Sequence, residues 1–90
     1  ASVLVDRLTN QVYLSDNRYI FAVDLNTRAI SRFGGEGSCV APLCPLYQTI
    51  YSNPFGLEFD QQRNIIFSDS NFFYIRKINV ANLTVEIIAG

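Results

Sequence analysis

The chain has 90 residues, a net charge of −1 and 49% hydrophobic residues, which fits one small domain or part of a larger one. Lys and Arg are scattered, so no clustered basic face predicts nucleic-acid binding. The chain contains no run of 18 apolar residues, so no transmembrane helix is predicted. It also contains no His, which is the commonest general base and metal ligand. Because small domains bury a smaller share of their surface, this apolar content predicts contact with a neighbour.

Residues 1–35 contain four short runs rich in Val, Leu, Ile, Phe and Tyr. The runs are residues 3–6, 10–16, 20–24 and 29–35. Turn-forming residues separate them, a pattern typical of an antiparallel meander. Asp16 closes the second run. We expect its carboxylate to bind nearby backbone amides; the alternative, a metal ligand, lacks a cluster of further oxygen donors.

Residues 36–54 interrupt the strand pattern with three prolines and contain the only two cysteines, Cys39 and Cys44. Two Cys without His cannot complete a four-ligand zinc site, and the spacing is not that of a redox C-x-x-C motif. We expect a local disulfide, with two free buried thiols as the alternative. A disulfide would indicate an oxidising compartment.

Residues 55–90 again contain four strand-like runs, at residues 56–59, 64–68, 73–79 and 84–88. The second and fourth runs are apolar on both faces, which predicts a sheet that is covered twice. Asp69 ends the second run, and we expect the same turn-stabilising role as for Asp16, with metal binding again as the alternative.

Arg76 and Lys77 are adjacent on a predicted strand, so their side chains point to opposite faces. We expect both on a solvated or salt-bridged surface, with one of them paired to Glu58 or Glu86. A ligand-facing role for Arg76 is the alternative.

Asn82-Leu83-Thr84 is an N-glycosylation sequon in the turn before the last predicted strand. A turn is exposed, so we expect a glycan on Asn82. Together with the cysteine pair, the sequon predicts an extracellular or secreted protein.

The two halves of the chain match in order. Residues 3–6 match 57–60, residues 10–16 match 64–69 with one extra residue in the first copy, residues 20–24 match 75–79, and residues 29–35 match 84–90. Such self-similarity predicts repeat units that stack on one another. We therefore divide the chain into a first copy (1–35), a connector (36–54) and a second copy (55–90).

The copies resemble the NHL repeat of β-propellers. The second copy carries most of that family's pattern, at Pro54, Gly56, Asp60, Asn64, Ser68-Asp69, Ile75-Arg76-Lys77-Ile78-Asn79 and Ile88-Ala89-Gly90. The first copy lacks the Pro-x-Gly entry and has Ala22-Val23 in place of Lys77-Ile78. The resemblance covers everything except the connector.

This resemblance implies an all-β fold of two four-stranded antiparallel meander blades, part of a larger or self-assembled propeller array. Strands 3–5 and 57–59 would be innermost, and residues 43–51 would hold a short helical stretch. We expect the copies to pack face to face through Val12, Leu14, Ile66 and Ile78. Something outside the 90 residues would then cover the other face of each copy.

The sequence thus predicts a non-catalytic extracellular β-propeller segment that acts as a structural or protein-interaction module. Its expected partners are further blades in the same chain or other copies of itself, with no cofactor, metal, nucleic acid or membrane insertion. One alternative is a building block of an extracellular filament or surface appendage. Another is a fragment of a lyase- or lactonase-like propeller enzyme whose catalytic residues lie elsewhere, since the inner strands here offer only Asp6, Glu58 and Asp60. RNA binding, known for some NHL propellers, lacks a basic face.

Overall fold

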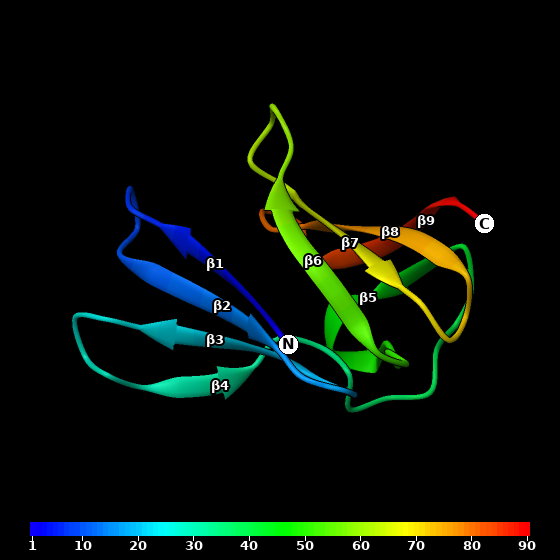
Figure 1. Ribbon diagram of the computed structural model, residues 1–90, viewed down its shortest axis with the longest axis horizontal. Helices are drawn as coiled ribbons and strands as arrows, with labels where there is room; N and C mark the ends of the chain where they lie inside the picture. The colour runs from blue at the N-terminus through cyan, green and yellow to red at the C-terminus, as the bar shows by residue number, and fades with distance from the viewer.

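The computed structural model describes all 90 residues and consists of two antiparallel sheets that follow one another along the chain (Figure 1). The first sheet has the order β1-β2-β3-β4, with β1 (Ser2–Asp6), β2 (Gln11–Ser15), β3 (Ile20–Asp24) and β4 (Ile30–Arg32). The second sheet has the order β5-β9-β8-β7-β6, with β5 (Leu43–Pro45), β6 (Pro54–Phe59), β7 (Ile65–Asp69), β8 (Tyr74–Asn79) and β9 (Thr84–Ala89).

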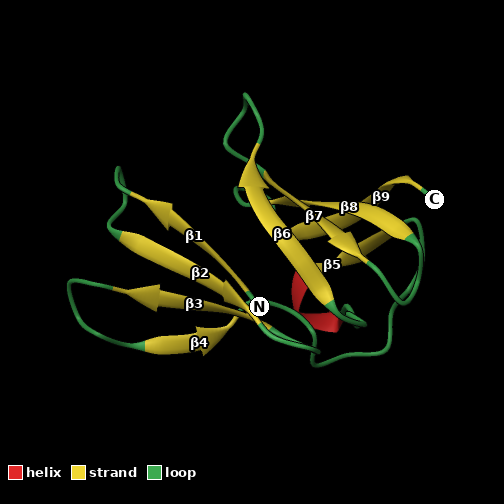
Figure 2. Ribbon diagram, viewed as in Figure 1, coloured by secondary structure: helices red, strands yellow, loops and turns green.

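Each predicted copy forms its own meander, in which consecutive strands pair and no strand crosses to the other sheet. The second sheet, however, has five strands and not the expected four. The connector supplies β5, which pairs with the free edge of β9 through Leu43↔Glu86. The expected helical stretch is correspondingly shorter. Only the 3₁₀ turn η1 (Leu46–Gln48) is helical, shown in red in Figure 2, because the residues just before it are held extended against β9.

Turns in the two copies use the same side-chain chemistry. The Oδ1 atoms of Asp6 and Asp60 accept hydrogen bonds from backbone amides in the turns that follow β1 and β6. Asp24 and Asn79 do the same after β3 and β8. A side-chain acceptor at this position fixes a tight turn, so both copies reverse direction at matching points.

Backbone geometry locates the extra residue of the first copy. Asn10 and Arg63 both have positive φ, 58° and 64°, at the end of the turn before β2 and β7. Asp6 pairs with Gln11, whereas the amide of Asp60 donates to the carbonyl of Asn64. The additional residue therefore lies in the β1–β2 turn. The second copy differs further by register shifts between Phe55 and Glu58 in β6 and between Ile75 and Arg76 in β8, which the first copy lacks.

The sheets pack through one face each, with β1 beside β6 (Figure 1). We call these the inner faces. The buried apolar cluster between the sheets and under the connector comprises Tyr13, Ile20, Ala22, Phe33, Leu46, Tyr51, Leu57, Ile65, Phe67, Ile78 and Val85. A shared core of this kind is the main source of stability in a small domain.

Gly34 leaves space for Tyr51 of the connector to pack against this core. Tyr51 donates a hydrogen bond from its hydroxyl to the carbonyl of Phe33 over 3.0 Å. Its ring lies so close to Gly34 that a Cβ there would fall 2.2 Å from the hydroxyl oxygen. Gly34 also has φ of 88°, so it meets both the steric and the backbone requirement.

The prediction of which residues join the copies was largely wrong. Ile78 is buried in the core, but Val12, Leu14 and Ile66 lie on the outer faces. In β2 the buried positions are Tyr13 and Ser15. Because side chains alternate along a strand, choosing the wrong parity moves every side chain to the other face.

Ile78 and Ile30 give a matched test of this assignment, because the first is fully buried and the second is 63% exposed. Ile78→Ala should lower the free energy of unfolding by about 2–5 kcal/mol, since it leaves a cavity in the core. Ile30→Ala should lower it by less than about 1 kcal/mol. Urea unfolding followed by circular dichroism measures both, and equal losses would contradict the assignment of faces.

Candidate functional site

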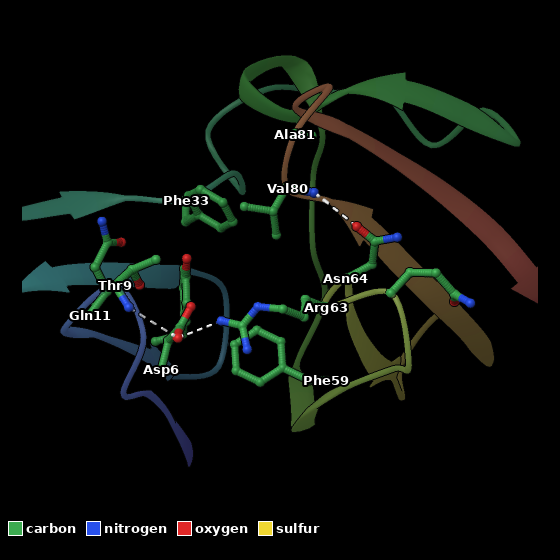
Figure 3. Close-up of a pocket in the computed structure, with 11 residues that line it drawn as sticks. Asp6, Thr9, Gln11, Phe33, Phe59, Arg63, Asn64, Val80 and Ala81 are labelled. Carbon is green, nitrogen blue, oxygen red and sulfur yellow. Dashed lines mark hydrogen bonds and ion pairs between the residues drawn. The ribbon is translucent and has the colours of Figure 1, made fainter.

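The largest hollow of the molecule is a cleft of about 420 Å³ between the two sheets. The turns after β1, β6 and β8 surround it, and Figure 3 shows their side chains converging from both sheets. Tyr13, Phe33 and Phe59 supply its apolar wall. Polar side chains from the turns supply its rim, among them Asp6 and Arg63. We call this hollow the inter-sheet cleft.

Asp6 and Arg63 form the one ion pair that joins the first sheet to the second. The Asp6 side chain is almost fully buried, whereas that of Arg63 is 45% exposed. Arg63 Nη2 donates to Asp6 Oδ1, which also accepts the amides of Leu8 and Thr9. The Arg63 guanidinium lies 5.0 Å from the centroid of the Phe59 ring. Arg63 thus contacts both Asp6 at the rim of the cleft and Phe59 in its apolar wall.

Burial opposes ionisation of Asp6, but the hydrogen bonds from Arg63, Thr9 and Leu8 outweigh it and lower the pKa of this carboxyl. Burial and the neighbouring Asp6 carboxylate raise the pKa of Tyr13. Asp6 Oδ1 therefore accepts hydrogen bonds from three donors, and the neighbouring Tyr13 hydroxyl stays protonated. This arrangement suits a structural contact better than proton transfer.

A second ion pair lies behind the cleft, within the second sheet. Asp69 and Arg76 have fully buried side chains, and Arg76 Nη1 lies 3.0 Å from Asp69 Oδ2. The same Nη1 donates to the carbonyl of Ile50 over 2.7 Å, and Asp69 Oδ1 accepts the amide of Ser52. The pair therefore fastens the connector to the sheet. Arg76 Nε and Nη2 are buried without a protein hydrogen-bond partner.

This geometry corrects the surface position expected for Arg76, which lies on the inner face because β8 alternates and Ile78 is also buried there. Lys77 points outward and pairs with Glu86 over 3.5 Å, one of the two expected acids. Burial raises the pKa of Asp69, with the Ser52 amide and Arg76 opposing the shift. Asp69 thus anchors the connector. The turn-stabilising role expected for it was wrong, because its carboxylate binds Ser52 and Arg76 and not the amides of the turn that follows.

The remaining predicted residues lie apart from the cleft. Asp16 accepts the amides of Arg18 and Tyr19, the turn-stabilising role expected for it. No three His, Cys, Asp or Glu side chains come together in a possible metal site. Cys39 and Cys44 are joined by a disulfide, and Cys44 is the middle residue of β5. Asn82 is exposed in the β8–β9 turn.

Sequence reasoning missed Arg63 as a contact residue. It lies 57 positions from Asp6, and only the packing of the sheets brings the two together. The internal repeat did contain a partial signal, because it placed Asp6 and Asp60 at equivalent turns and Arg63 within one of them. Nothing in the sequence indicated that this turn would reach the other copy.

The outer faces of the sheets form the second candidate site. On the first sheet, seven of eight outward positions are apolar: Val3, Val5, Val12, Leu14, Phe21, Val23 and Ile30, with Arg32 the exception. On the second sheet the outer face is mixed, and a hollow of about 300 Å³ lies beside Phe55, Ile66 and Ile75. An apolar patch of this kind is a candidate interaction surface.

No protein-family model and no curated protein matches the chain. The structure has no helix with the length and apolar character that crossing a membrane would require.

Asp6→Asn should lower the free energy of unfolding at pH 7 by about 1–3 kcal/mol, because it weakens a charged hydrogen bond between the sheets. The lowered pKa of Asp6 means that its ionised form stabilises the fold above the ordinary value of 3.8, and that this contribution is lost as pH falls through the folded-state pKa. The difference from wild type should therefore shrink in acid. Urea unfolding between neutral and acidic pH measures it.

Asp60→Asn is the matched control for that experiment. Asp60 makes equivalent turn contacts but has no ion pair to the other sheet. Its substitution should cost less than that of Asp6 at neutral pH. An equal cost for both variants would show that the ion pair contributes nothing.

Asp69→Ala should lower the free energy of unfolding by about 3–5 kcal/mol, because it leaves the Arg76 charge buried and uncompensated. The double variant Asp69→Ala, Arg76→Met removes that charge and should be more stable than Asp69→Ala alone. Chemical unfolding of wild type, Asp69→Ala and the double variant measures these differences in the free energy of unfolding. A double variant that is less stable than the single one would contradict it.

Proposed function

We propose that this chain is a non-catalytic extracellular segment of a β-propeller, in which the two sheets are consecutive NHL-like blades. Two successive meanders with matching turns support this assignment, as does the neighbouring position of β1 and β6, the strands expected to be innermost. β-Propellers commonly have four to eight blades. The segment would then act as a structural or protein-interaction module, either within a longer chain or among copies of itself.

The outer face of the first sheet is the observation that carries this proposal. Val3 and Ile30 are 62% and 63% exposed although both lie on strands with apolar neighbours. Fully burying one large apolar side chain contributes roughly 1.5–3 kcal/mol. Val5 is also exposed, and the other four apolar residues of this face are partly exposed. A protein partner that covers the face would recover the free energy of burying them.

An extracellular location is supported by two further features. The Cys39–Cys44 disulfide is the kind of bond that persists in oxidising compartments. The only N-glycosylation sequon of the chain lies on the exposed β8–β9 turn, away from the buried cluster.

A building block of an extracellular filament is the second candidate. The presence of an outer face at each end of the two-sheet stack favours it, because units with two uncovered ends can add to one another. A catalytic role gains no support from the inter-sheet cleft, where the acidic group is held by three donors and no His is present.

The 90-residue chain should self-associate in solution, because the outer face of its first sheet is apolar and uncovered. Light scattering across a wide range of protein concentrations should give a mass above that of the monomer, rising with concentration. A folded monomer with a cooperative thermal transition at all concentrations would contradict the proposed interaction role.

Asn82 should carry an N-glycan when the chain passes through a eukaryotic secretory pathway. Mass spectrometry before and after enzymatic removal of N-glycans measures the modification. Asn82→Gln should abolish it, and Thr84→Ser should retain it because Ser also completes the sequon. Secretion of wild-type chain with unmodified Asn82 would contradict this prediction.

A further inference from the structure

We infer that the outer face of the first sheet docks on the outer face of the second sheet of another copy of this chain. The inference rests on the proposed function and specifies its partner and geometry. It follows from a comparison of the two copies within one molecule, whose contact already shows what kind of surface covers such a face.

The copies can be aligned through their strand register, apart from the two register shifts in the second sheet. Ser15 pairs with Ile20 in the first sheet, and Ser68 pairs with Ile75 in the second. With Ser15 equivalent to Ser68, Leu14 corresponds to Phe67. Phe67 is buried on the inner face of the second sheet, whereas Leu14 lies on the outer face of the first.

The same inversion holds for the other strands. The outward residues of the first sheet and their inward equivalents in the second are Val3 and Leu57, Val5 and Phe59, Val12 and Ile65, Val23 and Ile78, and Ile30 and Val85. The outer face of the first sheet is thus the counterpart of a surface that the molecule buries in its own core.

The converse relation holds for the covering surface. Tyr13 and Ile20, which belong to the inner face of the first sheet, correspond to Ile66 and Ile75 on the outer face of the second. The two outer faces therefore occupy the same positions as the two halves of the interface between the sheets, although Glu58 and Lys77 stand in place of Leu4 and Ala22. A second copy can repeat that interface by presenting its second sheet to the first sheet of its neighbour.

Shape and charge agree with this pairing. The outer face of the second sheet carries the hollow beside Phe55, Ile66 and Ile75, which can receive apolar side chains. The only charged residue on the outer face of the first sheet is Arg32, whereas the other face carries both Glu58 and Glu86 against one Lys77. The two faces are opposite in net sign, which favours their contact over contact between like faces.

The Asp6–Arg63 ion pair is not repeated at the new junction. Asp60 takes the place of Asp6, and Asn10, which shares positive φ with Arg63, takes the place of the arginine. The junction between copies therefore depends on apolar contact. Because its two surfaces differ, the contact is heterologous and propagates into a ring or a filament.

Two charged double variants test the pairing. Val3→Glu with Ile30→Glu blocks the outer face of the first sheet, and Phe55→Glu with Ile75→Glu blocks that of the second. All four residues are exposed, so the fold should persist, which circular dichroism verifies. Each variant alone should be monomeric, with association weakened by more than about tenfold. An equimolar mixture should form a 1:1 dimer, because one intact face of each kind remains.

Analytical ultracentrifugation of the separate and mixed variants gives the answer. Leu8→Glu with Phe73→Glu is the matched control, since these apolar residues are 79% and 85% exposed at turns outside both faces, and it should associate like wild type. If the Phe55, Ile75 variant dimerises alone, like faces pair, and the inference is overturned while the interaction role stands. If the mixture stays monomeric, the head-to-tail pairing is overturned. A monomeric wild type overturns the interaction role itself.

Discussion

The burial of two sheet faces against each other is the contact on which the rest of this structure depends. Neither sheet has a core of its own, because each is a single layer of strands. Tyr13 from the first sheet and Leu57 and Ile65 from the second become buried only when the two layers meet under Tyr51 of the connector. Small domains bury a smaller share of their surface than large ones. The packing of the sheets and the folded conformation of the connector should therefore form and be lost together.

Two ion pairs act on that contact in different ways. Asp6–Arg63 spans the sheets at the rim of the cleft, where the Asp6 side chain is almost fully buried but that of Arg63 is 45% exposed. Asp69–Arg76 lies in the apolar interior, where desolvation is expensive and geometry decides the outcome. The first restricts how the sheets can move relative to each other. The second determines where the connector lies, since Arg76 also binds the carbonyl of Ile50.

The connector has more influence on the fold than its irregular sequence suggests. It adds β5 to the edge of β9, so that edge is paired and cannot easily recruit another strand. The disulfide links Cys39 to Cys44, the middle residue of that added strand. The edge of the second sheet on this side is then β5, a strand of only three residues that includes Pro45. Association through faces is more specific than pairing along an open edge, because side-chain shape decides which partner fits.

The sequence by itself determined the local features: eight of the nine strands, the turn at Asp16, the repeat and the pairing of two cysteines close in the chain. Each depends on neighbouring residues, whose propensities and spacing are visible in one dimension. The tertiary structure alone decided which faces meet, the burial of Arg76 and the Asp6–Arg63 contact. Val12 and Leu14 were assigned to the core because strands that are apolar on both faces give no parity signal. Only the packing of the second sheet on Tyr13 selects one face, and residues far apart in the chain become neighbours as a result.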